Sequence, residues 1–240
     1  MARKKKRSTL TTAEAVARLD RMLPILRRNV INALRIEATL EAGNNVVGSM
    51  EDRSIPGAGT YNTIKQSLGY DLAMHLARLY DVGTRHRHPN ERDVASIPLM
   101  VRLLRQRRCQ AALRNRARNG MPENPNRLTM YERDCMAAIE RASQAYSNTF
   151  KGEHGRGGLK TLKAFRDTFM AHSLLTDVEA DPRYNQLFKL TDSAREFVEA
   201  ARLAIDLANS SFDLSEKLFE KDATTFWEAA LLGKRSGGTR

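Results

Sequence analysis

Apolar residues recur at three- and four-residue intervals along almost the whole chain of 240 residues. This spacing places them on one face of an α-helix, whereas a half-buried strand alternates apolar and polar residues. The clearest run lies within residues 61–82, where the apolar positions are Ile64, Leu68, Leu72, Leu76 and Leu79. Strand-like alternation persists nowhere in the sequence. The sequence therefore predicts an all-α fold.

Glycine and proline divide the sequence into helical segments joined by short loops. The predicted helices cover residues 13–42, 61–82, 97–118, 128–151, 159–172, 183–209 and 214–231. Pro24 predicts a kink, or two helices that meet, in the first segment, and Gly43 predicts its C-terminal end. No internal repeat or shift in composition divides the chain, which favours a single bundle of long antiparallel helices over residues 11–232. The basic segments 1–10 and 233–240 are expected to be disordered tails.

The charge balance narrows the class of partner. The chain has 40 lysines and arginines against 28 aspartates and glutamates, a formal net charge of +12, and a pI near 10.0. Such an excess favours a polyanionic partner, nucleic acid first and an anionic membrane second. A basic surface that is merely solvated would have the same composition.

Cysteine content and hydropathy bear on the compartment. Cys109 and Cys135 show neither the spacing of a metal site nor a disulfide framework, so a reducing cytoplasm is expected. No stretch approaches the roughly 18 apolar residues of a membrane span. The basic N-terminus lacks the apolar region of a secretory signal. We therefore expect a cytoplasmic protein without a membrane anchor, a metal or a cofactor.

The predicted helix 159–172 carries the most informative pair of side chains, Arg166 and His172. On an ideal helix both border the apolar stripe, each about 60° from Phe169. A buried cation is costly unless it is paired or faces a cavity. Two interpretations remain open: a structural arginine paired with a carboxylate beside a core histidine, or a functional site.

The spacing of this pair limits any mechanism. Six positions along a helix correspond to about 9 Å of rise and roughly 120° of rotation, so the two side chains do not touch within one helix. They contact different parts of one ligand, or a second copy of the helix completes the site. His172 also lies near the predicted C-terminal end, where the helix dipole favours the imidazolium. That position suits a general acid, or a histidine that alternates between acid and base.

A second pair lies on the predicted helix 61–82. Asp71 and His75 are four residues apart and therefore share a face at the edge of the apolar stripe, with Arg78 just outside it. Asp71 is placed either to orient His75 or to hold Arg166. A pair at this spacing between helices is also common as a purely structural feature.

An arginine-rich run occupies the predicted helix 97–118, and no acidic residue lies between Arg102 and Arg118. Because the cation is always arginine, the run suits bidentate contact with phosphate. The alternative is a solvated basic face. The residues predicted to bind a nucleic acid backbone are Arg102, Arg105, Arg108, Arg114 and Arg116.

The segment from Arg166 through Asp167 to His172 resembles the signature of the HEPN superfamily (higher eukaryotes and prokaryotes nucleotide-binding). That signature is an arginine, usually followed by a polar residue, and a histidine after four to six intervening positions; here there are five. The segments 61–81 and 95–98 resemble the AbiU-type branch of abortive-infection proteins. Together the matches cover roughly residues 20 to 210 and leave out both basic tails.

The resemblance implies an all-α fold of HEPN type and usually a homodimer, in which the motifs of two chains line one cleft. It also implies a metal-independent endoribonuclease, often a toxin or antiphage effector. His172 would then be the general acid/base, Arg166 would stabilise the charged phosphorane, and Asp167 would orient the site or bind RNA. Asp71, Arg78 and Asp81 match the branch pattern without an assigned role.

The leading hypothesis is therefore a cytoplasmic, dimeric HEPN ribonuclease of the abortive-infection type that acts on RNA without a metal. The alternative is a non-catalytic helical module that binds nucleic acid or a nucleotidyltransferase-like antitoxin. A purely structural helical protein is the third interpretation.

Overall fold

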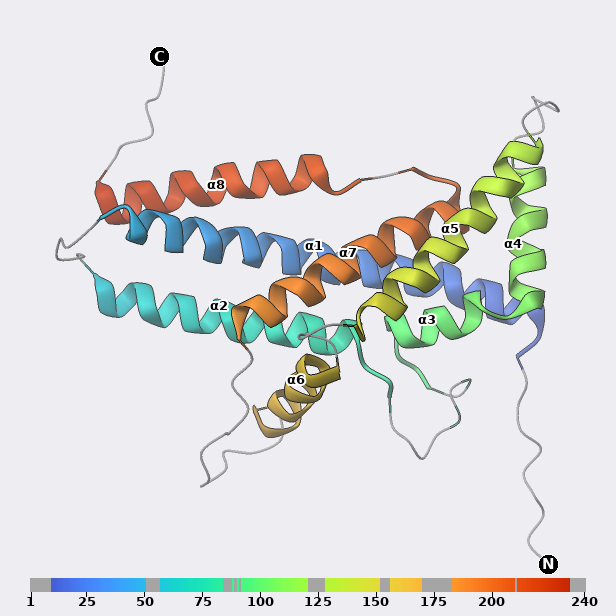
Figure 1. The fold of residues 1–240 in the computed structure, drawn as a ribbon, viewed down its shortest axis with the longest axis horizontal. Coiled ribbons are helices and arrows are strands. Elements are labelled where there is room, and N and C mark those ends of the chain that lie inside the picture. Colours follow the sequence, from blue (N-terminus) through green and yellow to red (C-terminus); the bar gives the residue numbers. More distant parts are fainter. Residues whose placement is uncertain are drawn as a thin grey trace, which may run out of the picture.

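A computed structural model describes residues 10–50, 57–83, 88, 90, 92–120, 128–151, 156–169, 183–209 and 211–233. These residues form eight helices, and no strand occurs among them, which confirms the all-α prediction (Figure 1). The helices are α1 (Thr12–Gly48), α2 (Ala58–Leu79), α3 (Ile97–Leu104), α4 (Arg107–Asn119), α5 (Leu128–Asn148), α6 (Arg156–Phe169), α7 (Tyr184–Asp206) and α8 (Asp213–Leu232). Most of both predicted tails, residues 1–9 and 234–240, lies outside the described part of the chain.

The longest helix, α1, lies at the centre of the bundle, where it packs against α2, α7 and α8. A capping box starts it: Thr11 accepts a hydrogen bond from the Glu14 amide, and the Glu14 carboxylate accepts one from the Thr11 amide. The helix runs through Pro24 without dividing into two. Pro24 is exposed, so water is available to the Asp20 carbonyl, which lacks its helical donor.

The expected helix end at Gly43 was wrong, because α1 continues to Gly48. A Cβ at Gly43 would lie 3.0 Å from Trp227 and 3.2 Å from Tyr61. This glycine therefore allows α8 and α2 to approach α1 closely, rather than ending the helix. The indole of Trp227 also donates a 2.8 Å hydrogen bond to the Thr39 carbonyl.

The single helix predicted over residues 97–118 is two helices, α3 and α4, separated by Arg105 and Gln106. Six of the eight residues of α3 are buried, so this helix lies inside the core. In α4 only Cys109, Leu113 and Ala117 are buried, which forms one stripe against α5. A straight helix could not meet both environments, and the chain turns between them (Figure 1).

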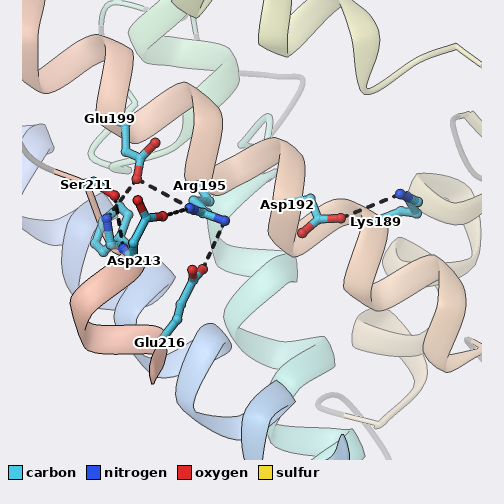
Figure 2. Close-up of polar contacts among 8 residues, drawn as sticks. Lys189, Asp192, Arg195, Glu199, Ser211, Asp213 and Glu216 are labelled. Carbon is cyan, nitrogen blue, oxygen red and sulfur yellow. Dashed lines mark hydrogen bonds and ion pairs between the residues drawn. The ribbon is translucent and has the colours of Figure 1, made fainter. Parts of the chain in front are cut away.

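Electrostatic contacts join α7 to α8. The Arg195 guanidinium lies among three carboxylates: Glu199 of α7 at 3.6 Å, Glu216 of α8 at 3.2 Å, and Asp213 at the start of α8. Figure 2 shows all three converging on this one side chain. The seam between these helices is therefore rich in acid, although the whole chain is strongly basic.

The helix α6 lies beside α2 and outside the main layer of helices (Figure 1). It spans Arg156–Phe169, so it begins three residues before the predicted start. Its position brings Asp81, just after the end of α2, next to Arg166.

Candidate functional site at the Arg166 cleft

Arg166 is presented by the amphipathic helix α6. Leu162 and Phe165 are buried on the side that packs on α2, each with 2% of its surface exposed, and the Phe165 ring lies 5.5 Å from that of Tyr70. Lys160 and Lys163 are exposed on the other side. Arg166 is at the border, with 29% of its side chain exposed, as the helical wheel predicts.

The partner of Arg166 is Asp81, just after the end of α2. The Arg166 Nη1 lies 3.2 Å from the Asp81 Oδ1, and the same oxygen accepts a 2.8 Å hydrogen bond from the Gly83 amide. Asp71, which the sequence also offered as a partner, lies instead 3.7 Å from the His75 Nε2. The carboxylate that holds Arg166 is therefore fixed by the turn that follows α2.

A second arginine, Arg92, contacts this turn from the segment before α3. Gly83 has φ +70°, and a Cβ there would lie 2.8 Å from the Arg92 Cδ. Arg92 donates a hydrogen bond to the Val82 carbonyl. Glycine is required here for two reasons, since it adopts the left-handed backbone and leaves room for the Arg92 side chain.

These groups surround a cleft of about 1100 Å³, here called the Arg166 cleft. Its charged lining residues are Asp81, Arg92, Asp93, Lys160, Lys163 and Arg166. Its apolar and aromatic lining residues are Ala77, Tyr80, Val82, Val94, Pro98, Tyr146, Phe150, Leu159 and Leu162. Among the described lining residues, four cations accompany two carboxylates, so this part of the cleft favours an anionic ligand with an apolar part.

The model of the AbiU2 family of HEPN proteins matches residues 17–226. The chain belongs to the AbiU2 family. No match was found among the curated proteins or among the solved structures. The matched range contains the segments that carry the resemblance, including residues 166–172.

The structure does not describe the side chains of two further residues that the resemblance implies for the site. Asp167 belongs to α6, but its side chain, like the whole of His172, lies outside the described part of the chain. Their roles remain predictions from the resemblance.

The supporting residues on α2 are divided between two environments. His75 is 8% exposed, with its Nδ1 3.0 Å from the Asn29 Oδ1, and burial lowers its pKa while Asp71 opposes that shift. Arg78 is exposed, and neither it, His75 nor Asp71 lines the Arg166 cleft. Of this predicted group, only Asp81 lies in the cleft.

Of the arginines predicted to bind nucleic acid, several are bonded to the protein itself. Arg116 holds Asp20 through two hydrogen bonds of 2.7 and 2.9 Å. Arg102 donates to the Asn90 side chain at 2.7 Å, and Arg108 donates to Gln106 at 2.9 Å and to the Leu10 carbonyl. These contacts fix α3 and α4 to their neighbours.

Arg107, Arg114 and Arg118 form a different group, which we call the α4 stripe. All three are exposed and line a smaller cleft of about 380 Å³ together with Gln110 and Asn115. Glu132 of α5 lies 2.9 Å from the Arg114 Nε and 3.7 Å from the Arg118 Nε. The predicted set contained only Arg114 of these three, although their spacing of seven and four residues places them on one helical face.

Two absences concern the described residues alone. No described helix is long and apolar enough to cross a membrane. Within the same ranges, no three His, Cys, Asp or Glu side chains are grouped as a metal site would require.

Proposed function

We propose that this chain is a metal-independent endoribonuclease of the abortive-infection or toxin type, with its site in the Arg166 cleft. The observation that carries the proposal is the position of the signature arginine. Arg166 lines a large cleft whose described lining residues include more cations than carboxylates. Membership of the AbiU2 family supports the same assignment.

The ion pair with Asp81 is compatible with this role. A carboxylate 3.2 Å from Arg166 orients the guanidinium before RNA arrives, and preorganised donors stabilise a developing negative charge best. Lys160, Lys163 and Arg92 supply further positive charge around a phosphate.

The reaction would be an internal transfer. The ribose 2′ oxygen gives its proton to a neutral imidazole and bonds to the adjacent phosphorus, while the bond from phosphorus to the 5′ oxygen breaks. An imidazolium gives a proton to that departing oxygen, leaving a 2′,3′-cyclic phosphate and a 5′ hydroxyl. We assign this acid/base role to His172 and the stabilisation of the phosphorane to Arg166. Asp167 would orient the site or bind RNA.

A homodimer, which the resemblance implies, would supply two such histidines to one cleft. The α4 stripe would add contacts to the RNA backbone outside the cleft, since exposed arginines bind phosphate in a bidentate manner.

A second candidate is a non-catalytic module that binds nucleic acid or a nucleotidyltransferase-like antitoxin. The observation in its favour is the same pair, because an arginine held by Asp81 can serve to fix α6 on α2. An acidic partner surface would also suit the cationic rim of the cleft.

Cleavage of RNA in EDTA by the purified chain distinguishes the ribonuclease from the non-catalytic binding module. We expect His172→Ala and Arg166→Gln each to reduce cleavage by at least about 100-fold while the products of the wild type end in 2′,3′-cyclic phosphate. Arg27→Gln, which changes an exposed arginine of α1 that lines neither cleft, is the matched control. Cleavage that survives both substitutions would remove Arg166 and His172 from the mechanism.

Mixing the two inactive variants tests the shared site. If each cleft takes groups from two chains, a mixture of Arg166→Gln and His172→Ala chains should recover part of the activity through mixed dimers. No recovery in a mixture shown by mass to contain mixed dimers would assign each site to one chain.

A further inference from the structure

Two aromatic rings meet inside the Arg166 cleft, where α5 ends. Tyr146 and Phe150 both line the cleft and are both partly exposed. Their ring centroids are 5.0 Å apart, and their planes are inclined at 83°. We call this pair the aromatic corner, because a flat group that stacks on one ring meets the other edge-on.

Arg105 holds the Tyr146 ring in place. Its guanidinium carbon lies 5.9 Å from the ring centroid, and its Nη2 donates to the Ser147 hydroxyl at 3.0 Å and the Ser143 carbonyl at 3.2 Å. Arg105 is not among the residues that line the cleft. The tyrosine is therefore supported from outside, and its cleft side remains available to a ligand.

The cations of the cleft come from other elements. Lys160, Lys163 and Arg166 follow one another along α6, and Arg92 lies in the segment before α3. The cleft thus has cations that attract phosphate on one side and the aromatic corner, which suits a planar ring, on another. A nucleotide has both parts, because its charged phosphate and its flat base are linked through one sugar.

We infer that the aromatic corner is a nucleobase-binding subsite of the Arg166 cleft, in which a base of single-stranded RNA stacks on Tyr146 or Phe150. The inference rests on the proposed function, since it assumes that the cleft receives RNA. Stacking on aromatic rings tolerates any base, so the corner would position the strand without reading its sequence. At about 1100 Å³ the cleft exceeds the usual volume of a small-molecule site, which leaves room for adjacent nucleotides.

Calorimetric titration of the full chain with adenosine 5′-monophosphate and with ribose 5-phosphate tests the subsite. The two probes share the phosphorylated sugar and differ by the base. We expect the wild type to bind the nucleotide more tightly than the sugar phosphate. Tyr146→Leu or Phe150→Leu should weaken the nucleotide by about 5- to 150-fold, the range that corresponds to loss of one base stack, and leave the sugar phosphate unchanged.

Tyr131→Leu is the control, since this partly buried tyrosine belongs to the same helix and lines neither cleft. Circular dichroism checks that each variant is folded, and the two corner variants test the inference independently of each other. Equal affinity of the wild type for both probes, or no measurable affinity for the nucleotide, would overturn the subsite.

The subsite and the proposed nuclease fail in different ways. If cleavage in EDTA requires Arg166 but neither corner variant alters nucleotide affinity, the subsite is wrong and the nuclease stands. If nucleotide affinity depends on Tyr146 while His172→Ala and Arg166→Gln leave cleavage intact, the base subsite stands and the proposed catalytic residues do not.

Discussion

Arg195 and Arg166 are equally exposed but lie in opposite electrostatic surroundings. The side chain of Arg195 is 28% exposed and that of Arg166 is 29% exposed. Three carboxylates surround Arg195 (Figure 2), whereas Arg166 has Asp81 beside it in a cleft where cations are in excess. Burial alone therefore does not separate a structural arginine from a candidate functional one. The local charge balance does.

The two arginines also differ in the elements around them. Arg195 joins two regular helices, α7 and α8, and its carboxylates come from those helices or their first residues. Around Arg166 lie the turn at 81–83 and the segment before α3. Sites built at such junctions gather groups from several elements around one position, whereas the Arg195 cluster only ties neighbouring helices together.

The largest expected effect on stability comes from substituting each of the two arginines with glutamine. Arg195→Gln should lower the free energy of unfolding by about 3 kcal/mol, because three carboxylates would then face one another without their cation. Arg166→Gln should lower it by less than about 1 kcal/mol, since the pair with Asp81 is partly exposed. Urea unfolding measures both.

RNA affinity should change in the reverse order, with Arg166→Gln weakening it and Arg195→Gln leaving it unchanged once the protein is folded. Equal losses of stability in the two variants would contradict the distinction between the seam and the cleft.

A second prediction concerns Glu37, an acid of α1 that is influenced by the charges of Asp192 of α7 and Glu216 of α8. Burial, and then the charges of Asp192 and Glu41, raises the pKa of Glu37 to about 8 from 4.5. One of its oxygens is buried without a hydrogen-bond partner in the described structure. Because the folded state holds this proton more tightly than the unfolded state, stability should be lost as pH rises from about 4.5 to about 8.

A pKa rise from 4.5 to about 8 corresponds to about 5 kcal/mol in full, and solvent screening of this partly exposed side chain should reduce the loss to about 2 kcal/mol. Glu37→Gln should remove this loss from the pH profile of urea unfolding. Asp222→Asn, which changes an exposed acid of α8, is the control and should keep the profile of the wild type. Burial lowers the pKa of His75, so this residue makes stability rise with pH near pH 6.5. The effect of Glu37 is therefore measured as the difference between the pH profiles of the variants. A Glu37→Gln profile that parallels the wild type would contradict the assignment.

A third prediction compares two glycines with the same backbone. Gly83 and Gly57 have φ of +70° and +74°, but a Cβ at Gly83 meets Arg92 at 2.8 Å, whereas a Cβ at Gly57 meets nothing within 4 Å. Gly57→Ala should cost about 1 kcal/mol through backbone strain alone. Gly83→Ala should cost about 1–2 kcal/mol and also displace Arg92 from the cleft, which weakens RNA binding. Unfolding and RNA titrations of both variants test this, and equal RNA affinity would show that Arg92 does not contribute.

The sequence predicts the helices and the face of α6, but not which residues meet across helices. The apolar stripe with Arg166 at its border follows from the period of the helix, and the structure confirms it. The choice between Asp71 and Asp81 as partner depends on which turn of α2 lies opposite α6, and helical periodicity carries no such information. The same limit applies to Gly43, whose role depends on the approach of Trp227 from the far end of the chain.

The arginine-rich run shows where the sequence could have yielded more. Charge counting treats the run as uniform, but a helical wheel of α4 alone aligns Arg107, Arg114 and Arg118 and separates them from Arg116. All three arginines lie within α4, so this grouping follows from their spacing and could have been predicted from the sequence.

The smallest expected effect concerns the α4 stripe. Substituting all three of its arginines with glutamine should reduce the slope of log affinity against log salt for single-stranded RNA by about 2, since each lost phosphate contact contributes about 0.7. The change in unfolding free energy should stay below about 1 kcal/mol, because the lost pairs with Glu132 are on exposed arginines. Fluorescence anisotropy at several salt concentrations gives the slope.

The control removes the same three charges elsewhere, so that net charge cannot explain the difference. Its exposed sites, which line neither cleft, are Arg27, Arg28 and Arg141. If the stripe binds the backbone, its variant loses more of the slope than this control, because phosphates are contacted only where arginines share a face. Equal slopes for the two triple variants would mean that RNA responds to the charge of the whole molecule. The stripe would then be a solvated surface, and RNA binding would rest on the Arg166 cleft.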